Sequence, residues 1–162
     1  MRNTIFILLF IPFIAASNLI YSQQYSLKEH PEFKVSIAGE VNYDSFFKDG
    51  DLIYEKLSND DLDLDVTVYS KDDGYEYFGA LEGFTKEMID ALGYTNSRFF
   101  DNQSTLKVKR RFLITYSQEW GCYIVFGVIQ DRSAQKQYEI ELFCYNISTD
   151  EARSIIKSIE ID

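Results

Sequence analysis

The sequence predicts an α+β domain, an antiparallel β-sheet covered by helices, and two patterns support this fold class. Residues 106–117, 122–130 and 137–145 predict three strands separated by short turn-like segments, as in consecutive antiparallel strands. Residues 148–159 combine a helix-start signal with apolar residues at helical spacing. The first two of the strands have apolar residues on both faces, which favours helices on both sides of the sheet, an α/β/α sandwich.

Residues 1–22 have the pattern of a cleavable secretory signal peptide. Arg2 supplies a positive start, residues 5–16 are uncharged and apolar, and small residues suited to cleavage occur around Ser17 and at Ser22. The apolar core of about twelve residues is shorter than the roughly twenty that span a bilayer. We therefore expect a secreted or periplasmic protein without membrane insertion after cleavage; an uncleaved anchor and a buried core segment are the alternatives.

The rest of the chain has the size of one domain. Residues 23–31 are polar and predicted to be flexible, and residues 32–162 are predicted to form a single α+β domain. Removing Arg2 with the signal would take the 16 basic residues to 15 against 26 acidic residues, a net charge of −11. That charge disfavours nucleic acid and anionic lipid as partners.

The first half of the domain is predicted to contain strands and one helix. Residues 33–37 predict a strand, residues 39–51 a loop with a short element inside, and residues 52–57 a weak strand. Residues 61–69 (DLDLDVTVY) predict a strand with one apolar face and one carboxylate face. Residues 80–92 predict a helix, because their apolar residues recur at helical spacing and a glycine follows.

The second half is predicted to be a three-stranded meander followed by a helix. Placing Val128 opposite Tyr138 puts apolar residues opposite one another along the whole of the last hairpin. The same reasoning joins the first two strands of the meander through a loop at residues 118–120. The closing helix begins at Ser148, because Ser148 and Glu151 have the spacing of a capping box.

Cys122 and Cys144 are the two cysteines of the chain, and the predicted register places them opposite each other. An exported protein meets an oxidising environment, so a cross-strand disulfide between them is predicted. The alternative is a pair of buried free thiols that behave as small apolar side chains.

Two charged clusters are candidate interaction surfaces. The acidic cluster is a predicted partner surface formed by Asp44, Asp49, Asp51, Asp61, Asp63 and Asp65. The basic cluster is a predicted patch for an anion or a partner, formed by Lys107, Lys109, Arg110 and Arg111. The alternative for the basic cluster is purely structural, with these residues pairing across strands to the acidic strand at residues 61–65.

No residue is predicted to be catalytic, cofactor-binding or metal-binding. His30 is the single histidine, and the chain has no HExxH or GxSxG motif. The DxDxD pattern of residues 61–65 lacks the glycine and the distal glutamate of a calcium loop, so strand alternation explains it better.

The order of elements resembles the PsbP-like α/β/α superfamily, which includes the periplasmic DcrB-type proteins. The resemblance covers residues 32–162 and is carried by Phe33-Lys34-Val35, by the passage from residues 66–68 to 84–87, and by residues 152–159. A proline and a tryptophan often follow the first strand in that family, whereas Ala38-Gly39-Glu40 stands here. The resemblance implies an accessory, assembly or binding protein without catalytic residues, and fold alone does not establish function.

These observations predict an exported, non-enzymatic binding or accessory protein that acts on a protein partner. The alternative is a small acidic immunity-type inhibitor of a basic toxin or enzyme, using the acidic cluster for electrostatic attraction. A third reading, a carboxylate-dependent hydrolase, would need a cleft lined with perturbed carboxylates.

Overall fold

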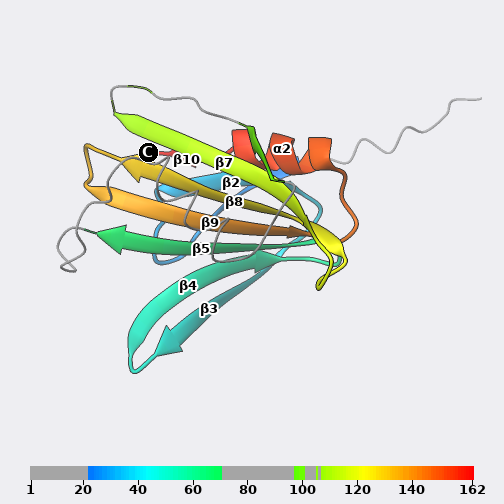
Figure 1. The fold of residues 1–162 in the computed structure, drawn as a ribbon. Coiled ribbons are helices and arrows are strands. Elements are labelled where there is room, and N and C mark those ends of the chain that lie inside the picture. Colours follow the sequence, from blue (N-terminus) through cyan, green and yellow to red (C-terminus); the bar gives the residue numbers. More distant parts are fainter. Residues whose placement is uncertain (1–21, 71–96, 101–104, 106) are drawn as a thin grey trace, which may run out of the picture.

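The computed structural model describes residues 22–70, 97–100, 105 and 107–162, and these form two antiparallel sheets and one helix (Figure 1). The large sheet has seven strands in the order β3-β4-β5-β9-β8-β7-β6, and the small sheet has the order β1-β2-β10. The elements are β1 Ser22–Ser26, β2 Phe33–Ala38, β3 Asn42–Lys48, β4 Asp51–Ser58, β5 Leu62–Ser70, β6 Arg98–Phe100, β7 Val108–Ser117, β8 Cys122–Asp131, β9 Lys136–Cys144, α2 Thr149–Lys157 and β10 Glu160–Ile161. Within the described residues, no helix is long and apolar enough to cross a lipid bilayer.

One face of the large sheet packs against both the small sheet and α2. The buried residues Phe33, Val35 and Ile37 of β2 join Ile156 of α2 in a single apolar cluster with the inward side chains of the large sheet. A smaller cluster on the opposite face is formed by Leu113, Cys122, Ile124 and Phe126. The main core therefore lies between the two sheets, and burial of these side chains provides most of the stabilisation.

The predicted helix-covered α/β/α sandwich is wrong. The described elements are nearly all strands, and β2 with α2, rather than a layer of helices, covers the main face of the sheet. Apolar residues on both faces of β7 and β8 suggested helices, but a second sheet buries such a face equally well. The predicted helix at residues 80–92 lies outside the described residues.

Two segments that were not predicted as strands pair in the structure. β1, in the segment expected to be flexible, pairs with β2 from Ser22 opposite Ala38 to Ser26 opposite Lys34. β3, in the segment expected to be a loop, pairs with β4 through a two-residue turn. Both turn residues, Asp49 and Gly50, have positive φ (56° and 96°), which is the requirement of a type I′ hairpin.

The C-terminal meander of β7, β8 and β9 is present and α2 follows it, but the predicted register is off by one residue. Tyr123, not Cys122, lies opposite Cys144. The β8–β9 turn decides this register, because Asp131 Oδ1 accepts hydrogen bonds from the amides of Ser133 (2.8 Å) and Ala134 (3.1 Å) and so includes Asp131 in the ladder. Since β8 is apolar on both faces, either register would have buried apolar side chains.

Helix α2 is held at both ends. The predicted capping box is confirmed: Glu151 N–H donates to Ser148 Oγ (3.2 Å) and Ser148 N–H donates to Glu151 Oε2 (2.8 Å). At the other end, the guanidinium of Arg110 on β7 donates to the carbonyls of Ile156 (2.6 Å) and Ile159 (2.9 Å). The capping box satisfies amides at the helix start that have no partner within the helix, and the Arg110 bonds fix the end of α2 on the sheet.

Candidate functional site

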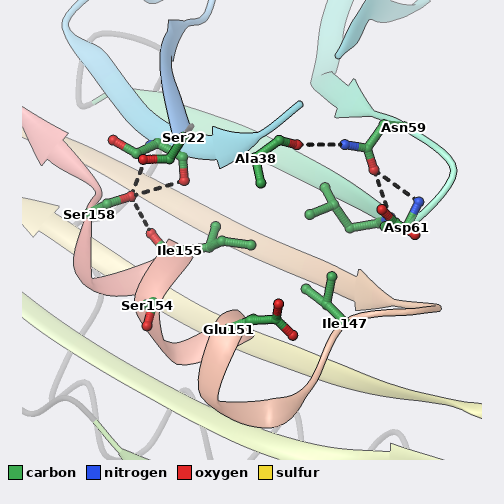
Figure 2. Close-up of a pocket in the computed structure, with 11 residues that line it drawn as sticks. Ser22, Ala38, Asn59, Asp61, Ile147, Glu151, Ser154, Ile155 and Ser158 are labelled. Carbon is green, nitrogen blue, oxygen red and sulfur yellow. Dashed lines mark hydrogen bonds between the residues drawn. The ribbon is translucent and has the colours of Figure 1, made fainter. Parts of the chain in front are cut away.

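A groove of about 360 Å³ lies where α2, β2 and the turn between β4 and β5 meet (Figure 2). Its volume is within the range of small-molecule sites. The residues that line it are Ser22, Ser36, Ala38, Asn59, Asp61, Leu62, Ile147, Glu151, Ser154, Ile155 and Ser158. Figure 2 shows Glu151 and Ile147 on the side formed by α2 and the segment before it, with Asn59 and Asp61 across from them.

The walls of the groove are joined by two polar side chains. Ser158 Oγ accepts a hydrogen bond from the Ser36 amide (2.9 Å), which fastens the end of α2 to β2. Asn59 Nδ2 donates to the carbonyl of Ala38 (3.3 Å), which fastens the β4–β5 turn to the same strand. Asn59 Oδ1 also accepts from the amide of Asp61 (2.9 Å), so the turn itself is ordered. The groove is therefore formed before any ligand arrives.

The groove combines an apolar floor with an acidic rim. Leu62, Ile147 and Ile155 supply the apolar surface, and Asp61 and Glu151 supply carboxylates. The described residues that line it include no lysine, arginine or histidine. Hydrogen bonds from the Ser148 backbone and then its hydroxyl lower the pKa of Glu151, so that carboxylate stays ionised under mildly acidic conditions.

Two of the four serines that line the groove donate their hydroxyl protons to the backbone of the helix. Ser154 Oγ donates to the carbonyl of Asp150 (2.9 Å) and Ser158 Oγ donates to the carbonyl of Ile155 (2.7 Å). Since a hydroxyl has one proton, what these groups offer a ligand is an acceptor oxygen. Together with the carboxylates of Asp61 and Glu151, these two oxygens give the groove four acceptor groups.

The six carboxylates of the predicted partner surface are divided among three places. Asp49 and Asp51 are exposed at the end of the β3–β4 hairpin, and Asp61 lies on the rim of the groove. The other three belong to the far face of the large sheet, where Asp44 is opposite Lys56 in the β3–β4 ladder and the Lys56 ammonium forms ion pairs with the other two. The same ammonium lies 2.7 Å from Asp63 Oδ2 and 3.6 Å from Asp65 Oδ1.

Three carboxylates on that face have raised pKa values. Burial is the main cause for Asp65, Glu139 and Glu141, and for Glu141 the charges of the other two raise the pKa further. Asp65 and Glu141 are directly opposite each other in the β5–β9 ladder. Within the described residues, no group of three histidine, cysteine, aspartate or glutamate side chains is arranged to hold a metal ion.

Replacing Glu141 by glutamine is expected to raise the free energy of unfolding by about 1 kcal/mol at pH 8. A carboxyl whose pKa is raised by folding favours the folded state while it is protonated, and that contribution is lost as the pH rises through the raised value. Glutamine cannot ionise, so its advantage should shrink as the pH falls towards 5. Urea unfolding of the parent protein and of Glu141→Gln between pH 8 and pH 5 tests this prediction. A stability gain from Glu141→Gln that grows on acidification would contradict it. Glu119→Gln, at an exposed position, is the control.

The four residues of the predicted basic patch do not share one surface. Arg110 reaches the end of α2 on the main-core face of the sheet. Lys109 and Arg111 alternate with it along β7, so they belong to the opposite face. The Arg111 guanidinium lies 4.2 Å from the ring centroid of Phe99 there, and Lys107 is exposed before the strand. β9 and β8 separate β7 from the acidic strand β5, which excludes direct cross-strand pairing between them.

The predicted disulfide is absent. Cys122 and Cys144 are free and buried, and they belong to the clusters on opposite faces of the sheet. Burial raises the pKa of Cys122 and raises that of Cys144 to about 12, so neither forms a reactive thiolate at neutral pH. The alternative interpretation, two buried thiols acting as apolar side chains, describes the structure.

Of the groove residues, only Asp61 was among the predicted site residues. The sequence does locate Glu151, through the capping box, and Ser36, on the polar side of an alternating strand. Neither signal indicates a cavity, because Ser36 and Ser158 are 122 residues apart in the chain and meet only after folding.

Comparison with known proteins finds a likeness in structure and none in sequence. No family model matches the sequence, and no curated protein sequence matches it. The structure is similar to that of the Ran-binding protein Mog1p from Saccharomyces cerevisiae, with 10% identity, a TM-score of 0.49, and coverage of 88% of this chain and 96% of that chain. The resemblance of the sequence to the PsbP-like superfamily therefore stays a prediction.

Proposed function

We propose that this protein is an exported, non-enzymatic binding protein and that the groove beside α2 is its ligand site. The observation that supports this most is the composition of the groove, an apolar floor of Leu62, Ile147 and Ile155 under two carboxylates with no basic residue among the described lining. The hydroxyls of Ser154 and Ser158 donate to helix carbonyls and not to either carboxylate, so neither serine is activated as a nucleophile. Binding is therefore a better fit to this site than catalysis.

The chemistry of the groove selects a small cationic ligand with an apolar body. An ammonium group would place its donors on Asp61, Glu151 and the serine oxygens, which are acceptors. A hydrocarbon segment would cover the apolar floor and displace water from it. An anionic ligand would meet two negative charges without a compensating cation, so it should be excluded.

Binding of n-hexylammonium to the purified protein, followed by amide chemical shifts, tests this proposal. Saturable shifts are expected at groove residues such as Ile147, Glu151 and Ser158, which line the cavity. Hexan-1-ol has the same apolar body without charge and should bind more weakly, and hexanoate should bind least. Equal binding of hexanoate, or shifts confined to residues away from the groove, would contradict the proposal.

Replacing Glu151 by glutamine is expected to weaken hexylammonium binding about fivefold, the size of a partly exposed ion pair. Glutamine at this position can still accept the Ser148 amide, so the helix start is retained. Asp150→Asn removes the same charge from the same helical turn at a residue outside the groove, and it should change the affinity less than twofold. If Glu151→Gln and Asp150→Asn weaken binding equally, the loss of affinity comes from the change in net charge, and the groove is not the binding site.

A further inference from the structure

The outer edge of β3 is long and regular. β3 is the end strand of the seven-stranded sheet, and among the described strands it pairs with β4 alone. The other end of that sheet is β6, with three residues, whereas β3 has seven and contains no proline. The bulge of this hairpin lies on β4, since Phe46 opposes Tyr54 and Phe47 opposes Leu52, and β3 keeps its regular course. Natural edge strands are commonly short, bulged or interrupted by proline, and β3 has none of these protections.

The same strand exposes large aromatic side chains. Phe46 is 56% exposed and Phe47 is 55% exposed, one on each face of the strand. The Phe46 ring stacks on Tyr54 of β4, with centroids 5.1 Å apart and planes at 5°. The hairpin separates from β5 beyond Glu55, where the β4–β5 ladder ends, so it extends from the body of the sheet (Figure 1). Exposed aromatic side chains on an edge strand are typical of a surface that another chain covers.

The charges on β3 match those of a second β3 strand. In an antiparallel pair of two β3 strands centred on Phe46, each Asp44 lies opposite Lys48 of the other copy, once on each side of the centre. A register shifted by one residue would place Asp44 opposite Phe47 or opposite Asp49, and both ion pairs would be lost. Asp44 and Lys48 are exposed in the structure and lie on the same face as Phe46. The strand is therefore self-complementary in one register.

We propose that two copies of this chain associate through their β3 edges, antiparallel and centred on Phe46. The two large sheets then form one continuous sheet related by a two-fold axis, which is the commonest symmetry of protein dimers. The two Phe46 rings meet at the axis and each continues into the stack with its own Tyr54. The proposal is independent of the groove ligand, because no residue of β3 lines the groove.

Sedimentation of the purified exported protein over a range of concentrations tests the association. A monomer–dimer equilibrium is expected, and Asp44→Lys should weaken it about tenfold or more because two ion pairs become two like-charge pairs. The double variant Asp44→Lys with Lys48→Asp restores both pairs and should recover the association to within about threefold. Glu119→Lys makes the same charge change at an exposed position in the β7–β8 turn and should leave the association unchanged.

Cross-linking tests the register. In the proposed pair residue 46 faces itself, so Phe46→Cys should form a disulfide between copies about tenfold faster than Ser45→Cys, whose position faces Phe47. The native cysteines are buried and do not compete. A chain that stays monomeric to roughly millimolar concentration would overturn the proposal. So would a dimer that Asp44→Lys does not weaken, or equal cross-linking from positions 45 and 46.

Discussion

Gly127→Ala is expected to lower the free energy of unfolding by about 3 kcal/mol, the upper range for overpacking a core. Gly127 lies opposite Phe112 in the β7–β8 ladder, and the Phe112 ring occupies the space that a side chain at residue 127 would need. A Cβ at this position would lie 1.8 Å from Cδ1 and 2.2 Å from Cε1 of that ring. Phe112 is fully buried, so the ring cannot move without disturbing the main core.

Urea unfolding of Gly127→Ala against Gly39→Ala separates the collision from the ordinary effect of replacing a glycine. A Cβ at Gly39 meets nothing within 4 Å, but the positive φ of 79° should still cost about 1 kcal/mol. Combining Gly127→Ala with Phe112→Leu should cost less than the sum of the two, because leucine leaves room for the added methyl group. If Gly127→Ala is as stable as Gly39→Ala, the predicted steric clash with the Phe112 ring is wrong.

The strands of the meander could be predicted because their pattern is long and local, but their exact partners could not. β7 and β8 bury side chains on both faces, so two neighbouring registers bury similar apolar surface. The choice is made by Asp131, whose side chain accepts bonds from the turn and extends the ladder by one residue pair. The hydrogen bonds of the turn, rather than the apolar pattern, therefore set the register. Because the register differs by one residue from the predicted one, Cys122 is not opposite Cys144 and the predicted disulfide is absent.

The β3–β4 hairpin was missed although a local signal for it was present. Asp49-Gly50 is a typical type I′ turn sequence, but its acidic and aromatic neighbours hid the alternation of the flanking strands. The groove and the small sheet, by contrast, depend on contacts between the two ends of the chain. Lys34 of β2 lies opposite Glu160 of β10, and such pairing leaves no trace in any short window of sequence.

Glu55 makes a buried contact that joins the N-terminal segment to the β3–β4 hairpin. Glu55 is fully buried, and its Oε1 accepts hydrogen bonds from the amides of Lys28 (2.8 Å) and Glu29 (3.0 Å). The hydroxyl of Tyr43 donates to the same oxygen. Burial, followed by this hydrogen bond, raises the pKa of Tyr43 to about 12, so the phenol remains a donor at neutral pH.

Glu55→Ala is therefore expected to lower the free energy of unfolding by about 3 kcal/mol, because three donors lose their acceptor. Glu55→Gln keeps one acceptor oxygen of nearly the same shape and should cost about 1 kcal/mol, the difference between a charged and a neutral acceptor. Urea unfolding gives both values, and amide hydrogen exchange at Lys28 and Glu29 should accelerate most in the alanine variant. Glu40→Ala, at an exposed position, should stay within about 0.5 kcal/mol of the parent protein. If Glu55→Ala is no less stable than Glu40→Ala, the N-terminal segment is held to the hairpin by apolar packing around Leu27 and not by this carboxylate.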